Sequence, residues 1–116
     1  MISVVIPVYN EQDNVQELHQ KLAMAAKKFD LDLEVIFVDD GSTDKTLKRL
    51  KGLSDVKIVE LRRNFGQTAA FDAGIKNSRG EIIITMDGDL QNDPNDIPRL
   101  LRKINQGFEV VVGWRK

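Results

Sequence analysis

The sequence predicts a three-layer α/β sandwich in which helices cover both faces of a mostly parallel sheet. Short runs rich in Val and Ile alternate along the chain with stretches whose apolar residues recur at helical spacing. Such alternation is typical of parallel strands joined by right-handed helical crossovers. The chain has 116 residues, the size of one domain, and its 41% of apolar residues are enough for a core of moderate size. We therefore expect one domain over residues 1–116, with the first four strands in the order 3-2-1-4 and the place of a fifth strand left open.

Five apolar runs predict the strands. Each is rich in β-branched residues, and several are followed directly by residues that end strands. We expect Pro7 to end the first strand, Asp39-Asp40-Gly41 the second and Asp87-Gly88-Asp89 the fourth. The runs cover residues 2–6, 33–38, 56–61, 81–86 and 108–112.

Four stretches between these runs predict helices. Asp93, followed by Pro, is a candidate N-cap of the last helix. Asn10 is a candidate N-cap of the first helix, and Ser42 or Thr43 of the second. The third helix, at about 67–77, carries a face of small residues that would let it approach the sheet closely. The supporting positions are Val15, Leu18, Leu22, Ala25 and Phe29; Leu47 and Leu50; Ala69, Ala70, Ala73 and Gly74; and Ile97, Leu100, Leu101 and Ile104.

Composition and charge exclude several classes of function. The chain has no Cys and one His, so it can form neither disulfides nor zinc sites built on thiolates or on several imidazoles. Its 17 basic and 18 acidic residues give a formal net charge of −1, whereas a general nucleic-acid-binding protein would carry a basic excess. No apolar run is long enough to span a bilayer, and the N-terminus lacks the features of a signal peptide. We expect a cytoplasmic protein without a nucleic-acid partner.

Acidic side chains follow three of the predicted strands. Glu11 comes after the first strand, Asp39 and Asp40 after the second, and Asp87 and Asp89 after the fourth. Ligands of open α/β sheets bind beyond the carboxyl ends of the strands, so these carboxylates are expected on one rim. Like charges this close repel each other unless a cation or a donor neutralises them. Oxygen ligands without Cys or several His favour Mg²⁺ or Mn²⁺ over Zn²⁺.

The Asp87-Gly88-Asp89 segment is the strongest single indication of a site. Its two carboxylates can act in different directions, one on a metal directly and one through water, and Gly88 lets the backbone approach a ligand. Taken alone, the tripeptide is more often a turn. Asp39-Asp40-Gly41 likewise has the alternatives of strand-end polarity before a helix cap or the paired acids of a phospho-acceptor receiver domain. The third strand ends in Arg62-Arg63-Asn64, without the acceptor Asp that a receiver domain needs.

An ordered set of motifs runs through the whole chain. They are residues 4–11 (Val-Val-Ile-Pro-Val-Tyr-Asn-Glu), 38–44 (Val-Asp-Asp-Gly-Ser-Thr-Asp), 63–66 (Arg-Asn-Phe-Gly), 86–91 (Met-Asp-Gly-Asp-Leu-Gln) and 113–115 (Gly-Trp-Arg). Together they resemble the motifs of family 2 glycosyltransferases, which have the GT-A fold, and in particular the dolichol-phosphate mannose synthase group and its bacterial polyprenyl-phosphate relatives. Each motif is weak alone, but the ordered set is specific.

The resemblance implies the Rossmann-like, nucleotide-binding half of a GT-A glycosyltransferase. The donor would be a nucleotide-diphosphate sugar, linked to UDP or GDP, and the acceptor a polyprenyl phosphate. The sugar would be transferred in one inverting displacement with Mg²⁺ or Mn²⁺ as the cofactor. The implied nucleotide contacts are Pro7, Tyr9, Glu11, Val38, Asp40, Asp87 and Gly88, the implied metal ligands are Asp87, Asp89 and Gln91, and the implied catalytic residues are Asp89 and Arg115.

Members of the family continue past the Gly113-Trp114-Arg115 motif. We therefore expect this chain to be the N-terminal part of such a protein, truncated before acceptor-binding elements that associate with membranes in longer relatives. Two functions stay open, the donor-binding part of a glycosyltransferase or a nucleotide-binding module that performs no transfer. A missing antiparallel strand would leave sheet edges with which a second copy can pair, so a homodimer is a further prediction.

Overall fold

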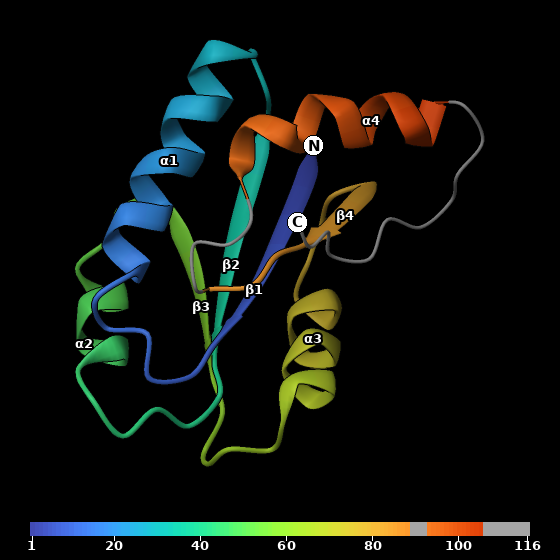
Figure 1. The fold of residues 1–116 in the computed structure, drawn as a ribbon. Coiled ribbons are helices and arrows are strands. Elements are labelled where there is room, and N and C mark those ends of the chain that lie inside the picture. The colour runs from blue at the N-terminus through green and yellow to red at the C-terminus, as the bar shows by residue number, and fades with distance from the viewer. Residues whose placement is uncertain (89–92, 106–116) are drawn as a thin grey trace.

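The computed structural model describes residues 1–88 and 93–105, which form a parallel sheet with helices on both faces (Figure 1). The strands are β1 (Ile2–Val8), β2 (Leu33–Asp39), β3 (Val56–Glu60) and β4 (Ile82–Thr85). They pair in the order β3-β2-β1-β4, and each pairing is parallel. This confirms the predicted α/β class and the order of the first four strands. The fifth strand, expected at 108–112, lies outside the described residues.

The helices form the two outer layers of the sandwich. One face of the sheet is covered by α1 (Val15–Lys28), α2 (Thr46–Lys51) and α4 (Ile97–Asn105), the last preceded by a 3₁₀ turn, η1 (Pro94–Asp96). The other face is covered by α3 (Gln67–Lys76) (Figure 1). The three-layer arrangement is therefore the one that the alternation of strands and helices predicts.

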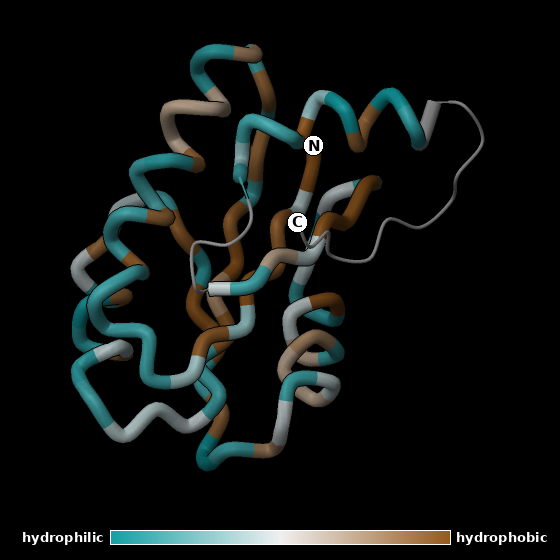
Figure 2. Tube along the Cα trace, in the orientation of Figure 1, coloured by the Kyte–Doolittle hydropathy of each residue, from teal (hydrophilic) through white to brown (hydrophobic). Residues whose placement is uncertain are grey.

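Alternating side chains of β1 enter two cores, one on each face of the sheet. Ile6 is fully buried on the side of α1, where Leu18 and Leu22 pack against the sheet. Val5 points to the opposite side and packs in the core that includes Ala70 of α3. Because both faces of the central strands are covered, these strands are apolar at most positions, which Figure 2 shows as mainly brown segments through the sheet.

Helix α3 approaches the sheet closely because its inner face carries small residues. Ala70 and Gly74 are buried and Ala73 is half-buried, as predicted, whereas Ala69 is exposed and does not belong to this face. A Cβ atom on Gly74 would lie 2.3 Å from Cγ1 of Val5. No side chain larger than hydrogen fits there without a shift of the helix, so Gly74 sets the distance between α3 and β1.

The N-cap predicted for the first helix is wrong. Helix α1 begins at Val15, and its N-cap is Asn14, which makes no side-chain cap hydrogen bond. Asn10 lies in the preceding loop with a left-handed backbone, at φ 53°. Its Oδ1 accepts a hydrogen bond from the backbone N–H of Thr43 at 2.8 Å. Asn10 therefore joins the loop after β1 to the loop after β2, and this contact between loops overrides its local preference for a cap.

The cap predicted for the second helix is displaced in the same way. Helix α2 begins at Thr46, whose N–H donates to the carboxylate of Asp44 at 2.9 Å. Ser42 instead accepts from the backbone N–H of Asn10 at 2.9 Å. The polar residues between β2 and α2 thus serve the packing of the two loops as well as the start of the helix.

The sequence predicts that Pro7 ends the first strand. This prediction is wrong, because β1 continues to Val8 beside β2. The pairing with β4 stops earlier, at Val5 and Thr85. Val8 directs its carbonyl toward β2, where it accepts from Asp40 N–H at 2.9 Å. Neighbouring residues of a strand direct their backbone groups to opposite sides, so the missing N–H of Pro7 faces β4. The ladder between β1 and β4 ends there, after Met86 N–H donates to the carbonyl oxygen of Val5 at 3.0 Å.

The predicted start of the last helix is confirmed. The side chain of Asp93 accepts from the backbone N–H of Asn95 at 2.9 Å, and Pro94 takes the first position of η1. Ile97 and Leu100 are buried against the sheet. No helix within residues 1–88 and 93–105 combines the length and the apolar character that crossing a membrane requires.

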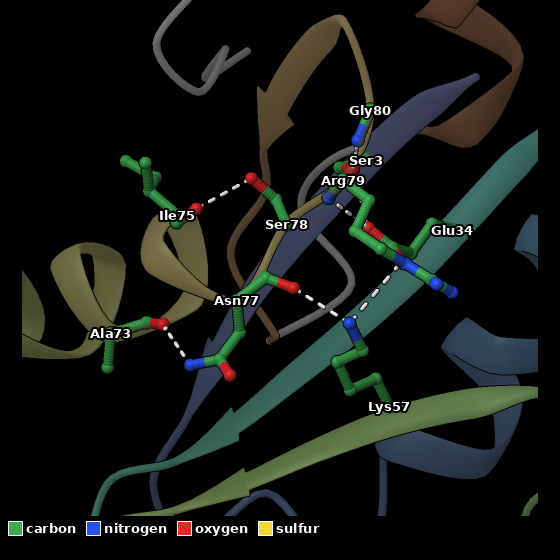
Figure 3. Close-up of polar contacts among 9 residues, drawn as sticks. All are labelled: Ser3, Glu34, Lys57, Ala73, Ile75, Asn77, Ser78, Arg79 and Gly80. Carbon is green, nitrogen blue, oxygen red and sulfur yellow. Dashed lines mark hydrogen bonds and ion pairs between the residues drawn. The ribbon is translucent and has the colours of Figure 1, made fainter.

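Glu34 ties four segments together at the edge where the strands begin (Figure 3). Its Oε1 accepts from Ser3 Oγ and from the backbone N–H of Arg79, each at 2.8 Å, and its Oε2 lies 3.4 Å from Lys57 Nζ. The Glu34 side chain is only 9% exposed. The N–H of Arg79, with help from Ser3 and Lys57, lowers the pKa of Glu34 from 4.5 to about 2, although burial acts in the opposite direction. This carboxylate therefore holds β1, β2, β3 and the connection from α3 to β4 in place.

Candidate functional site

A cleft of about 390 Å³ opens at the end of the sheet where the strands end, opposite the contacts of Glu34. Its walls come from the end of β1 and the loop that follows, the end of β2, the segment that enters α3 and the turn after β4. This is the edge where parallel α/β sheets bind their ligands. The described lining residues are Pro7, Val8, Tyr9, Glu11, Asp40, Asn64, Gly66, Gln67, Asp87 and Gly88.

The structure brings most of the expected nucleotide contacts together in this cleft. They meet although they are far apart in the sequence, because β1, β2 and β4 are parallel and end at the same edge. The residues that line it are Pro7, Tyr9, Glu11, Asp40, Asp87 and Gly88. Val38 is not among them, since its side chain is fully buried in the core under α3.

Asp40 holds the entrance of α3 with both oxygens of its carboxylate. Oδ1 accepts from the N–H of Phe65 at 2.9 Å, and Oδ2 accepts from the N–H of Gly66 at 3.2 Å. The residue is only 5% exposed. A buried carboxylate that accepts two backbone N–H groups fixes the position of the loop that supplies them. Asp40 therefore shapes one wall of the cleft by placing residues 65–66.

Asp87 meets the first residue of α3 across the cleft. Gln67 Nε2 donates to Asp87 Oδ1 at 2.9 Å. Asp87 follows β4, while Gln67 follows the loop that Asp40 holds, so this contact closes the cleft on a third side. Gln67 is neutral, so this contact brings no positive charge to Asp87.

The loop after β1, which forms one wall of the cleft, is held by the N-cap of α1 and by the first residue of α2. Glu11 accepts from Asn14 Nδ2 at 2.7 Å, and its backbone N–H donates to Thr46 Oγ1 at 2.9 Å. Tyr9 stands at the mouth of the cleft with 43% of its surface exposed. An exposed aromatic ring beside a cleft offers a flat apolar surface on which a ring can stack.

Gly88 packs tightly against β1. A Cβ atom at this position would lie 2.6 Å from Cγ1 of Val8 and 3.4 Å from the carbonyl oxygen of Pro7. The glycine is thus required by the contact between the turn after β4 and the end of β1. The sequence points to the close approach of a ligand at Gly88, and the structure shows a close approach of the protein's own chain.

The sequence did not single out some of the residues that line the cleft. Asn64, Gly66 and Gln67 reach it because Asp40 draws the loop before α3 toward the end of β2. Asn64 and Gly66 belong to the Arg-Asn-Phe-Gly motif at 63–66, for which the local pattern indicates no role, and Gln67 appears in the sequence only as the start of the third predicted helix. Val8 also lines the cleft, as the last residue of β1.

The remaining site residues expected from the sequence lie outside the described residues. They are Asp89, Gln91 and Arg115. Within residues 1–88 and 93–105, no group of three or more His, Cys, Asp or Glu side chains is placed to hold a metal ion. The donor set that is described nevertheless suits a hard cation, because the cleft carries the carboxylates of Glu11, Asp40 and Asp87 and none of its described lining residues is basic.

The family-wide sequence profile of glycosyl transferase family 2 matches residues 3–116. The chain belongs to this family. It is 48% identical over 122 aligned residues to the dodecaprenyl-phosphate galacturonate synthase of Rhizobium johnstonii, covering 99% of this chain and 36% of that protein. It is 44% identical to the undecaprenyl-phosphate 4-deoxy-4-formamido-L-arabinose transferase of Pseudomonas fluorescens, covering 98% of this chain and 35% of that protein. This family 2 chain thus spans about a third of the length of the curated relatives it matches.

Solved structures of glycosyltransferases share the fold. The mannosyltransferase PcManGT from Pyrobaculum calidifontis, in complex with GDP-Man and Mn²⁺, superposes with a TM-score of 0.73 at 26% identity, over 87% of this chain and 31% of that one. Glucosyl-3-phosphoglycerate synthase from Mycobacterium tuberculosis, in complex with Mn²⁺, UDP and glucosyl-3-phosphoglycerate, gives a TM-score of 0.73 at 25% identity, over 90% of this chain and 39% of that one. The sheet and helices described above are therefore those of a family 2 glycosyltransferase.

Proposed function

We propose that this chain binds the nucleotide-diphosphate sugar donor, together with a divalent cation, and that the whole protein transfers the sugar to a polyprenyl phosphate. The observation that carries this proposal is the convergence of Glu11, Asp40 and Asp87 in one cleft at the carboxyl edge of the sheet. A diphosphate would be repelled by this acidic cleft unless positive charge lay between them. The cleft therefore favours a nucleotide that arrives with a cation.

The described residues would divide the work of binding the donor. The exposed ring of Tyr9 would lie beside the base, and Glu11 and Asp40 would line the nucleotide's side of the cleft. Asp87 would supply a carboxylate oxygen to the cation, with Asp89 and Gln91 as further proposed ligands. Val38 would contribute only through the backbone that leads to Asp40, since its side chain is buried.

The chemistry of transfer needs charge stabilisation more than proton transfer. Breaking the bond between sugar and diphosphate builds negative charge on the departing diphosphate, which a bound Mg²⁺ or Mn²⁺ would stabilise. Arg115 is the proposed side-chain partner of those phosphates. A phosphate acceptor is already anionic near neutral pH, so it needs little help from a general base. We propose a single inverting displacement.

The relatives support this assignment of substrates. The curated relatives are named for dodecaprenyl phosphate and undecaprenyl phosphate. The solved relatives are complexes with GDP-Man and Mn²⁺ or with UDP and Mn²⁺. Both bases occur among them, so the choice between UDP and GDP is left to experiment.

Calorimetric titration with UDP and GDP, each with and without Mn²⁺, tests donor binding. We expect one nucleotide to bind with an affinity that rises when Mn²⁺ is present. Asp87→Asn keeps the shape of the side chain but removes its charge, so the gain from Mn²⁺ should fall by roughly 10-fold or more. Asp32→Asn is the matched control, because Asp32 is 78% exposed at the other end of β2. Binding of neither nucleotide, or an Asp87→Asn variant indistinguishable from the control, would contradict the proposal.

Transfer itself separates an enzyme from a nucleotide-binding module. The whole protein, incubated with the nucleotide sugar, the cation and a polyprenyl phosphate, should yield a polyprenyl-phosphate sugar and free nucleotide diphosphate. Binding without product under these conditions would favour the module.

A further inference from the structure

Gln67 links the start of α3 to the carboxylate that is proposed to hold the cation. Its Nε2 donates to Asp87 Oδ1 at 2.9 Å, and both residues line the cleft. A carboxylate with one oxygen held by an amide donor has a preferred orientation before any ligand arrives. Groups that hold a metal ligand in this way raise the affinity for the metal without touching it.

The position of Gln67 is itself fixed by the sheet. Asp40 accepts from the N–H groups of Phe65 and Gly66, at 2.9 and 3.2 Å, and Gln67 follows them directly as the first residue of α3. Farther along, the helix lies so close to β1 that a Cβ atom on Gly74 would be 2.3 Å from a β1 side chain. Gln67 therefore acts from a rigid element, which is what an orienting residue requires.

The chemistry of Gln67 suits a carboxylate that must still attract a cation. An amide N–H holds one oxygen of Asp87 without bringing a positive charge to the cleft. A lysine at the same place would form an ion pair with Asp87 and compete with the cation for it.

We propose that Gln67 is a positioning residue that orients Asp87 toward the divalent cation accompanying the nucleotide. The proposal rests on the proposed function and deepens it, because it assigns a role in cation binding to a residue outside the Asp-Gly-Asp segment. Gln67 acts through Asp87 and needs no contact of its own with the nucleotide.

The test measures the Mn²⁺ dependence of nucleotide binding by calorimetry, using whichever of UDP and GDP the unsubstituted chain binds. Gln67→Ala should raise the Mn²⁺ concentration for half-maximal binding by roughly 10-fold. At saturating Mn²⁺ its nucleotide affinity should return to that of the unsubstituted chain. Gln67→Lys should raise the required Mn²⁺ further. Gln20→Ala, which removes the same side chain from the exposed face of α1, is the matched control and should change neither quantity.

Each outcome has a distinct meaning. An unchanged Mn²⁺ requirement in Gln67→Ala would overturn the inference and leave the proposed function standing. A weaker nucleotide affinity that persists at saturating Mn²⁺ would also overturn it, since Gln67 would then be a nucleotide contact. If the unsubstituted chain shows no Mn²⁺-dependent binding, the proposed function fails and the inference fails with it. Urea unfolding of the Gln67 variants, with a midpoint equal to that of the unsubstituted chain, shows that the fold is intact.

Discussion

Asp40 shows how a single residue of the cleft can serve the site and the fold together. Its two oxygens accept from the N–H groups of Phe65 and Gly66, and only 5% of the residue is exposed. The same carboxylate lines the cleft. A substitution at Asp40 is therefore expected to affect both binding and stability, whereas a residue that only meets the ligand would affect binding alone.

Asp40→Asn should lower the free energy of unfolding by about 1–3 kcal/mol. The asparagine amide retains one acceptor, and its NH₂ group would face a backbone N–H that has lost its partner. Nucleotide affinity should fall as well, because the entrance of α3 is no longer held. Urea unfolding and nucleotide calorimetry measure the two effects. Asp32→Asn, at a residue whose side chain is 78% exposed, should stay within about 0.5 kcal/mol. Equal stabilities of the two variants would contradict the role given to Asp40.

Helix α3 is the element on which the cleft depends most. Its first residue, Gln67, contacts Asp87, its entrance is held by Asp40, and its inner face packs on β1 and β2. Gly74 sits where this face comes closest to the sheet, 2.3 Å from Val5 Cγ1 for an added Cβ. The distance between α3 and the sheet thus determines where the far wall of the cleft stands.

Gly74→Ala tests which of two opposing effects is larger in α3. Helix propensity alone would make this substitution stabilising by about 1 kcal/mol. We expect the opposite sign, a loss of about 1–3 kcal/mol, because the added methyl overlaps Val5 and displaces the helix. Chemical denaturation gives the sign directly. Ala69→Gly in the exposed part of the same helix measures the propensity effect by itself. A Gly74→Ala variant more stable than the unsubstituted chain would contradict the close contact.

The structural contacts of Glu34 and the cleft lie at opposite ends of the parallel strands. Glu34 joins the beginnings of the strands (Figure 3). The cleft lies where the strands end. A substitution at Glu34 is therefore expected to change stability without changing the cleft, whereas a substitution at Asp40 affects both. Among the described strands, β3 and β4 are the outer ones, and pairing of two copies through a sheet edge stays a prediction.

Glu34 should make stability fall at acid pH. Its pKa in the folded chain is about 2, below the ordinary 4.5, chiefly because the N–H of Arg79 binds the charged form. A group with a depressed folded pKa contributes its full stabilisation above its unfolded pKa and loses it as the pH falls toward the folded value. The contribution of Glu34 should thus be complete above pH 4.5 and decline between pH 4.5 and 2.

Urea unfolding of Glu34→Gln measures this contribution. At pH 7 the variant should be less stable than the unsubstituted chain by about 2 kcal/mol, since it loses charged acceptor contacts with Ser3, Arg79 and Lys57. The difference should shrink as the pH is lowered below 4.5. Glu17→Gln, at an exposed residue paired with Lys21 within α1, is the control and should change stability little at any pH. A stability difference for Glu34→Gln that does not depend on pH would contradict this account.

The sequence by itself determined the fold class, the order of the first four strands and the edge at which the acidic residues gather. These follow from local patterns, because alternating strands and helices allow few right-handed topologies and parallel strands end at a common edge. The start of the last helix at Asp93 was predictable for the same reason, since its cap acts within two residues.

Only the tertiary structure decided which polar side chains meet. Asn10 is a residue type that often caps helices, but its side chain accepts a hydrogen bond from Thr43 instead. Gln67 hydrogen-bonds to Asp87, twenty positions away in the sequence. Val38 belongs to a motif of the family, yet its side chain lies in the core. Such contacts depend on how loops from different strands pack beside one another, and a hydrogen bond between distant residues leaves no periodic signal in the chain that would reveal it.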